Sequence, residues 1–405
     1  MNPWAGLSRY RPWLEFKMIN LFCIRPHGFN VGNDVIFLGL QHFLREAFGE
    51  VVNLISLPAT SRYESQAKAG LTGKTIYEIN QYGHGVIVGG GNLYENGELD
   101  VNLDALPSLE VPLMLFSLSR GRIYNRRSQL VPRTDAMPER VIQALHRKAC
   151  CSLVRDRATL QFLQRIGCDP ILGGCPTIFV DRMADRLPSL AECDRNTALI
   201  SVRNPALMSI PLEKQAQVYQ DVLDIIALLR REGFADVRLL CHDHRDLSFA
   251  ASFPDIDYVY TGDVYTYLAL LRSCALNVTY RLHSMLPCLA FGTPAIKISY
   301  DERALSLVET IGFGDWNIDM MQTRDVASRV RERYRRLKDL RTMRTKARPV
   351  WENLHSTMLD GFRQFASEVR NYRGQISPET QTSRTAPVRS RCVGPVAVAQ
   401  PIISP

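Results

Sequence analysis

The sequence has no long apolar run and no paired-cysteine motif, and each absence excludes a class of protein. No stretch approaches the roughly 18–20 uninterrupted apolar residues of a membrane-spanning helix. Residues 1–15 lack the basic-then-apolar order of a secretory signal, so we expect a cytoplasmic protein. The ten cysteines form no CxxC pair and share no repeated spacing, which argues against a zinc ribbon and agrees with a reducing compartment.

The length and the pattern of the chain predict an α/β protein with two domains. The chain has 405 residues, 46% of them hydrophobic, which is too long for one ordinary core. Short β-rich runs alternate with amphipathic stretches and no internal repeat occurs, a pattern typical of parallel sheets covered by helices. We expect strands at Met18–Ile24, Val51–Leu57, Gly85–Val88, Pro112–Ser117, Cys151–Val154, Ala198–Val202, Val237–Cys241, Asp257–Tyr260, Ala275–Thr279 and Ala295–Ser299.

Changes in composition divide the chain further. Asp181–Asn196, with a proline and scattered charges, is expected to be a linker, so we place the first domain at 1–185 and the second at 186–348. Residues 349–372 predict a final helix, and 373–405, rich in Ser, Thr, Pro and Gln, predict a disordered tail. The apolar face expected for this final helix consists of Trp351, Leu354, Met358, Phe362 and Phe365.

The net charge of +8 comes from one segment. Residues 324–348 hold eleven basic and three acidic residues, so the rest of the chain is balanced. As a helix, this segment has one apolar face and arginines elsewhere. Two interpretations stay open: a solvated helix face, or a surface that contacts anionic lipid or a polyprenyl-phosphate-linked substrate at the inner face of the membrane. Because no aromatic residues suited to stack on bases interleave with the basic ones, we expect no nucleic-acid partner. The predicted apolar face consists of Ala327, Val330, Tyr334, Leu337 and Leu340.

A charged pair follows a predicted strand of the second half. Arg281 and His283 come after the apolar run that ends near Thr279, at the start of a short predicted helix, Ser284–Ala290. Ligands of open α/β sheets bind at the carboxyl ends of the strands, and helix N-termini attract anions. An arginine there suits a carboxylate or phosphate, and a histidine can transfer a proton near neutral pH. Taken alone, both residues could equally be structural.

Three further segments are candidates with structural alternatives. Gly89, Gly90 and Gly91 end a predicted strand, where a ligand or another backbone could approach closely, or the chain could simply turn. Cys241–Asp246 holds His242 and His244, but no third ligand at metal-site spacing stands out, so we expect cleft contacts and no metal. Arg155–Arg157 predicts an ion pair and a helix cap at Asp156.

Five segments in order resemble the polysaccharide pyruvyl transferase family across about residues 18 to 315. The strongest is RLHS at 281–284, followed by a helix, GTP, a strand and the pair Tyr300-Asp301. The other four are the Asn-x-Gly-Asp-like NVGND at 30–34, VIVGGGNL at 86–93, SLVRDR at 152–157 and ISVR at 200–203.

The resemblance implies a fold and a reaction. It implies two Rossmann-like domains with a cleft between them, as in GT-B glycosyltransferases, with the acceptor on the first domain and the donor on the second. It implies phosphoenolpyruvate as co-substrate, no cofactor, and a nucleotide- or lipid-linked saccharide of exopolysaccharide or cell-envelope synthesis as acceptor, which becomes a pyruvate ketal. His283 would be catalytic, and Arg203, Arg281 and Ser284 would bind the donor. The acceptor or cleft residues would be Asn30, Gly32, Asp34, Gly89, Gly90, Gly91, Asn92, His242, His244 and Tyr300.

Two departures and two alternatives accompany this resemblance. NVGND has one extra residue, so either Asn33 or Asp34 takes the place of the family's acid. After Tyr300-Asp301 the family's lysine is replaced by Arg303, which keeps the charge without lysine's compact geometry. The alternatives are a GT-B glycosyltransferase with a sugar-nucleotide donor and an inactive relative that acts as a scaffold in glycan assembly.

Overall fold

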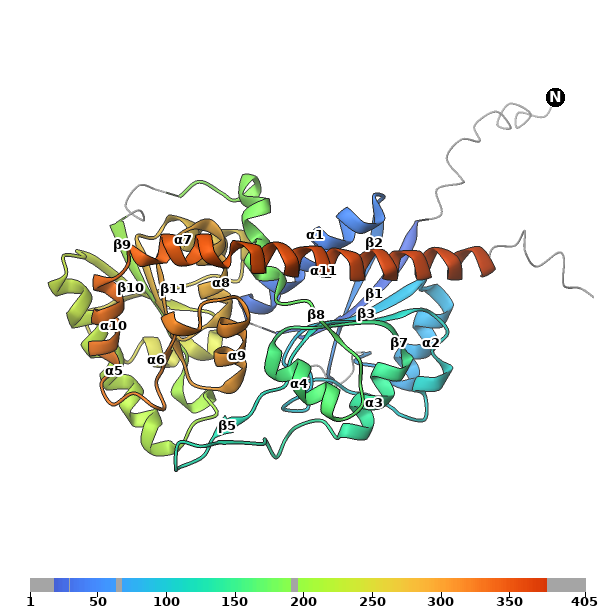
Figure 1. Cartoon of the computed structure of the whole chain (residues 1–405), viewed down its shortest axis with the longest axis horizontal. Helices are drawn as coiled ribbons and strands as arrows, with labels where there is room; N and C mark the ends of the chain where they lie inside the picture. The colour runs from blue at the N-terminus through green and yellow to red at the C-terminus, as the bar shows by residue number, and fades with distance from the viewer. Residues whose placement is uncertain (1–17, 29, 63–67, 191–195, 377–405) are drawn as a thin grey trace, which may run out of the picture.

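A computed structural model describes residues 18–28, 30–62, 68–190 and 196–376 of the chain. The chain forms two α/β halves, each built around a six-stranded sheet, and one long helix runs across both (Figure 1). Within the described residues, no helix is long and apolar enough to cross a membrane. The predicted tail, 373–405, begins inside this long helix, and its residues from 377 onward lie outside the described part.

The first sheet is entirely parallel, with the strand order β2-β1-β3-β4-β7-β8. Its strands are β1 Ile19–Arg25, β2 Val52–Pro58, β3 Gly85–Gly91, β4 Leu113–Leu118, β7 Ala149–Val154 and β8 Ile171–Leu172, with a separate hairpin of β5 Ile123–Tyr124 and β6 Leu130–Val131. The accompanying helices are α1 Val31–Phe48, α2 Gly73–Tyr82, α3 Glu139–Lys148 and α4 Arg157–Arg165.

The second sheet is also parallel, with the order β11-β10-β9-β12-β13-β14. Its strands are β9 Thr197–Ser201, β10 Asp236–Cys241, β11 Asp257–Tyr260, β12 Leu276–Thr279, β13 Ala295–Ser299 and β14 Ile318–Asp319. Its helices are α5 Leu212–Arg231, α6 Leu247–Ala250, α7 Val264–Ser273, α8 Leu282–Phe291, α9 Glu302–Thr310 and α10 Val326–Arg335. All ten predicted strands are confirmed, with ends that differ by at most three residues. The α/β fold prediction, with two Rossmann-like sheets, is therefore confirmed.

Two predicted segments differ from the structure. The basic segment 324–348 is not one helix, because the chain turns between Arg335 and Asp339 and begins the long helix α11, Asp339–Ile376. The expected boundary at 348/349 therefore falls inside a helix. The expected linker begins within the 3-10 segment η3, Pro176–Arg186, where Met183 is buried; the apolar packing of this segment gives it an ordered conformation.

Helix α11 fastens the two halves together (Figure 1). Near its start, the Trp351 Nε1 donates to the Ile311 carbonyl of the second half at 2.9 Å. Further along, Phe362 stacks on Phe43 of α1 in the first half, with ring centroids 5.7 Å apart. The five residues predicted for its apolar face are all buried. Aromatic pairs of this kind contribute about 0.5–1.5 kcal/mol beyond their area burial, so α11 stabilises the pairing of the halves.

A candidate anion-binding active site between the two halves

A cleft of about 910 Å³ lies between the two halves, where the carboxyl ends of both parallel sheets meet. Its lining is rich in cations: six arginines face it against three acids, Glu98, Asp135 and Asp301. The six are Arg62, Arg155, Arg203, Arg245, Arg281 and Arg303. This surplus of positive charge in a partly dry space favours an anionic ligand.

Strand register brings two of these arginines together. Strands β9 and β12 are neighbours, and Ser201 pairs with Thr279 at their carboxyl ends. Arg203 and Arg281 each come two residues after a member of this pair, so both reach the same point of the cleft. The strand-end position in the sequence suggested an anion-binding role for Arg281, whereas Arg203 was predicted only from the resemblance to the family.

Buried acids hold the two guanidinium groups in place. Arg281 donates through Nε to the Val202 carbonyl at 3.1 Å and through one Nη to Asp246. The second Nη takes part in neither bond. The Arg203 Nη1 lies 3.6 Å from Asp243 and 3.7 Å from Asp246 and has no hydrogen-bond partner within the described residues. Fixed cations with uncommitted donors are suited to bind a carboxylate or phosphate.

The cation pair is held in an electrostatically strained arrangement. Burial, with a further contribution from the Arg281 charge, lowers the pKa of Arg203 to about 10. Burial alone would raise the pKa of Asp243, but hydrogen bonds from Arg245 and the charges of Arg245 and Arg203 lower it to about 2. An incoming anion would relieve the repulsion between Arg203 and Arg281, which adds to its binding.

His283 lies at the irregular first turn of α8, beside the arginines. Its backbone angles, φ −80° and ψ 20°, depart from helical values, and its Nε2 has no hydrogen-bond partner in the described part of the chain. Burial, followed by the charges of Arg155, Arg281 and Arg303, lowers the pKa of His283 to about 3. In the unliganded protein the imidazole is therefore neutral at pH 7.

A chain of polar groups fixes the backbone at this turn. The Tyr267 hydroxyl donates to the His283 carbonyl at 3.0 Å and lies 2.5 Å from the Nε2 of His242. The carbonyl of His242 accepts from the amide of Val31 at 3.0 Å, which is the first residue of α1 in the other half. His242 therefore belongs to the support of His283 and links both halves at the site.

Gly32 allows α1 to approach the histidine. A β-carbon at Gly32 would lie 3.0 Å from the Nδ1 of His283 and 3.0 Å from the Oδ1 of Asn30. Asn30 itself caps α1 by accepting from the Gly32 amide at 3.0 Å and lines the cleft. The glycine is thus required by the close packing of the two halves, and it does not itself line the cleft.

Two glycines of the triplet pack against α1, and the third lines the cleft. Gly90 has a positive φ of 79°, and a β-carbon there would lie 2.4 Å from Ile36 of α1. Gly89 similarly faces Leu40, whereas Gly91 lines the cleft next to Asn92. Gly89 and Gly90 therefore serve the approach of α1 to β3 and do not line the cleft.

Two further predicted site residues, Ser284 and Asp34, also lie away from the cleft lining. The Ser284 hydroxyl is buried 2.7 Å from Ser201 and accepts from Asn277 at 2.7 Å, so it joins α8 to β9 and β12. Asp34 pairs with Arg25 at 2.9 Å, and its neighbour Asn33 faces the cleft. Of the remaining predicted residues, His244 and Tyr300 line it.

The sequence did not identify the part played by Arg155, Arg303 and Glu95. Arg155 lines the cleft and donates to Ser119 at 2.5 Å, while Asp156 caps α4 as predicted by accepting from Thr159. Arg303 binds Asp301 and reaches Glu95 of the first half at 3.1 Å. The tertiary fold brings Glu95 and Arg303 together, although more than two hundred residues separate them in the sequence.

Comparison with known proteins identifies the family. The model of the family described as polysaccharide pyruvyl transferase matches residues 30–302, about two thirds of the chain. No curated protein matches the sequence.

Solved structures share the architecture at low identity. A UDP-N-acetylglucosamine 2-epimerase from Rickettsia bellii has a TM-score of 0.53 at 13% identity, covering 89% of this chain and 99% of that one. A Listeria monocytogenes protein proposed to be a UDP-N-acetylglucosamine 2-epimerase has a TM-score of 0.50 at 12% identity, covering 93% and 100%. The likeness is one of fold, a GT-B arrangement of two Rossmann-like domains. Because the family match covers most of the chain, including most strands of both sheets and the whole arginine-histidine segment, this chain belongs to the polysaccharide pyruvyl transferase family.

Proposed function

We propose that this protein transfers the pyruvyl group of phosphoenolpyruvate to two hydroxyls of a saccharide, forming a pyruvate ketal and releasing phosphate. The observation that carries the proposal is the convergence of Arg203, Arg281 and His283 in one cationic cleft. Phosphoenolpyruvate has a carboxylate and a phosphate attached to the same carbon, so two adjacent guanidinium groups match its two anionic ends.

In the proposed reaction, His283 as an imidazolium donates its proton to the methylene carbon of the donor. The central carbon becomes electrophilic, one saccharide hydroxyl adds to it, and the bond to the phosphate oxygen breaks. A second hydroxyl then adds and closes the ketal. One hydroxyl proton restores His283 and the other leaves with phosphate, so atoms and charge balance. Arg203 and Arg281 stabilise the charge on the departing phosphate, and such fixed donors supply much of a typical rate enhancement.

This proton transfer requires that donor binding first raises the pKa of His283. Burial and, after it, the surrounding arginine charges lower the pKa of His283 to about 3, so the ring is neutral at pH 7 before the donor binds. A bound trianion neutralises those charges, so the pKa of His283 rises toward neutrality when the donor binds. His283 therefore carries the proton next to the reacting carbon only when the donor is bound.

The acceptor is proposed to bind from the first half, against Asn30, Gly91 and Asn92, with His244 and Tyr300 opposite. The cleft of about 910 Å³ has room for a saccharide beside the donor. The fold neighbours are named for UDP-N-acetylglucosamine, which supports a nucleotide-linked saccharide as acceptor. A lipid-linked saccharide of exopolysaccharide or cell-envelope synthesis presents the same sugar chemistry.

The basic helices support a proposed peripheral contact with the inner face of a membrane. Several arginines and lysines of α10 and of the first turns of α11 are exposed, while Arg333 is buried and donates to the Asp315 carbonyl at 2.8 Å. Exposed basic groups of these helices would attract anionic lipid, with about 1 kcal/mol of binding free energy per residue near the membrane surface. Such a contact would place the cytoplasmic enzyme near a lipid-linked acceptor.

The proposal is tested at His283. Replacement of His283 by Gln should abolish acceptor-dependent phosphate release from phosphoenolpyruvate, measured by phosphorus NMR, while donor affinity changes less than about threefold. If the variant retains transfer, His283 is not the proton donor. If the variant loses donor affinity and thermal stability together, His283 is structural. Binding of a sugar nucleotide but not of phosphoenolpyruvate would instead support a GT-B glycosyltransferase, and binding of neither would support a scaffold.

A further inference from the structure

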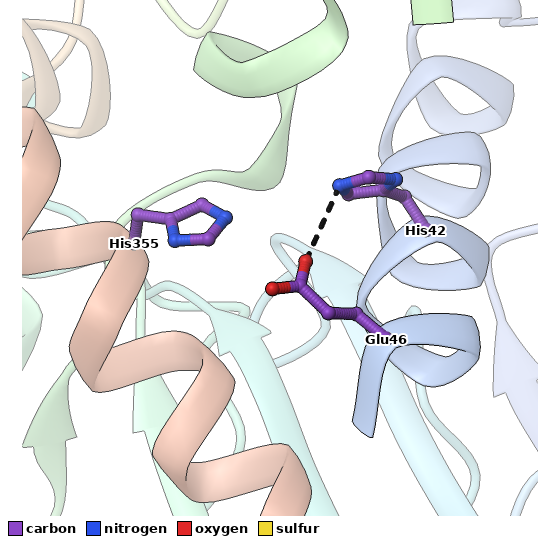
Figure 2. Close-up of side chains that lie close together, drawn as sticks. All are labelled: His42, Glu46 and His355. Atoms are coloured by element: carbon purple, nitrogen blue, oxygen red, sulfur yellow. Dashed lines mark ion pairs between the residues drawn. The ribbon is translucent and has the colours of Figure 1, made fainter. Parts of the chain in front are cut away.

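A second group of potential ligands lies outside the cleft, between α1 and α11. His42 and Glu46 are one turn apart on α1, and His355 projects from α11 toward them (Figure 2). One ligand atom of each residue lies within 4.8 Å of the other two, and the Nε2 of His42 is 3.6 Å from the Oε2 of Glu46. The three side chains face a common point from two helices that are far apart in the sequence.

The two imidazoles have nitrogens without hydrogen bonds. The Nε2 atoms of His42 and His355 are both buried and have no hydrogen-bond partner within the described residues, although that of His42 lies near Glu46. Unpartnered buried nitrogens cost stability, so such a pair needs an explanation. Aromatic packing supports the His355 ring, whose centroid lies 5.0 Å from that of Phe43 and 5.1 Å from that of Phe179. Burial also lowers the pKa of both imidazoles, which keeps them in the neutral form that binds metal ions.

We propose that His42, Glu46 and His355 form a site for a divalent zinc-class ion that joins α1 to α11. Two imidazoles and one carboxylate are a common ligand set for zinc, with water in the fourth position. Metal–ligand bonds of about 2.0–2.1 Å in a tetrahedron place ligand atoms about 3.4 Å apart. The His42–Glu46 pair is already close to that separation, and a small inward movement of His355 completes the triangle.

The surrounding charge sets the strength of this site. Arg45, Arg182 and Arg186 lie close enough to act on the pKa of His42, and their charges oppose a cation. We therefore expect weaker binding than at a four-ligand structural site, and selectivity for zinc over magnesium because magnesium prefers oxygen ligands. The structural consequence is that a bound ion would fix α11 on the first half just beyond its contact with Ile311 of the second.

The test uses the full-length protein and zinc chloride as the probe. Chelator-treated protein should bind about one zinc per chain after dialysis and should melt several degrees higher with zinc than with magnesium. In His42→Gln and Glu46→Gln, the zinc-dependent shift and the bound zinc should both disappear. The shift is measured within each variant, so a general loss of stability from the substitution does not affect the comparison.

A matched variant distinguishes this site from the cleft. His244 is partly exposed and lies beside Asp243 in the cleft, so His244→Gln should retain full zinc binding. Zinc binding that survives in both α1 variants, or that is lost in His244→Gln, would overturn the proposal. The absence of any zinc binding by the wild-type protein would overturn it as well.

Discussion

The two halves of the molecule contribute differently to the same cleft. The second half supplies the proposed donor-binding charges: Arg203 and Arg281, fixed by Asp243 and Asp246. In the first half, Gly32 has no side chain, and this allows α1 to pack closely against His283. The second half therefore places the proposed reacting groups, while the first half shapes the space around them.

The largest expected effect on activity comes from removing one of the two arginines proposed to bind the donor. Arg281→Ala should lower kcat/KM for pyruvyl transfer by about 1,000-fold or more, because one fixed donor for the phosphate is lost. Arg281→Lys keeps the charge without the planar fork and should lose about 10- to 100-fold. Steady-state kinetics with a thermal-stability check measures both, since Asp246 loses its partner in the alanine variant. Equal activity of the alanine variant and wild type would show that the cation pair does not serve the reaction.

Gly32→Ala tests whether the close approach of α1 positions His283. The added β-carbon would lie 3.0 Å from the Nδ1 of His283 and displace it, so we expect a loss of about 10- to 100-fold in kcat. Alanine is the better helix former, so stability should not fall through helix propensity. Gly73→Ala at the start of α2 is the control, because its nearest neighbour would be 3.8 Å away. Unchanged activity in Gly32→Ala would mean that the first half does not position His283.

The third prediction concerns the uptake of a proton by His283 when the donor binds. In the empty protein the pKa of His283 is about 3, so at pH 7 the ring is unprotonated. Because donor binding should raise this pKa, phosphoenolpyruvate should bind with uptake of up to one proton that His283→Gln does not show. Calorimetry in two buffers of different ionisation enthalpy measures the difference. The same uptake in both proteins would assign the proton to another group.

The smallest expected effect concerns the buried acid. The folded-state pKa of Asp243 is about 2, below its usual value near 3.9, so its stabilising contribution is present above pH 4 and is lost as the pH falls toward 2. Asp243→Asn should therefore be less stable than wild type by about 2 kcal/mol at pH 6. Urea unfolding at several pH values checks this, and the difference should shrink as the pH falls below 4. A difference that stays constant would show that packing, and not charge, is responsible.

The charged part of the site could be predicted from sequence because it depends on local order. Arg281 follows an apolar strand directly, and the carboxyl ends of parallel strands meet at one edge, whereas Arg203 was predicted from the resemblance to the family. The strands themselves were found for the same reason, since their apolar runs are short and separated by amphipathic helices.

The remaining features depend on contacts between distant segments, which local patterns do not encode. The approach of Gly32 to His283, the Glu95–Arg303 pair and the facing of His42 and His355 each join residues that are far apart in the chain. Ser284 shared a motif with His283, yet the helical turn directs its hydroxyl into the buried Ser201–Asn277 network. The break in the basic segment before Asp339 was also missed, because its apolar pattern continues through the turn.

The identity of the donor is the central claim, and thermal shift measures it most directly. Phosphoenolpyruvate is compared with UDP-N-acetylglucosamine and other sugar nucleotides, with wild type and Arg281→Lys side by side. A ligand that binds only the folded state raises the melting temperature, by an amount that grows with its concentration relative to Kd. The account predicts a shift with phosphoenolpyruvate in wild type that is much reduced in Arg281→Lys. A shift with a sugar nucleotide and none with phosphoenolpyruvate would contradict it.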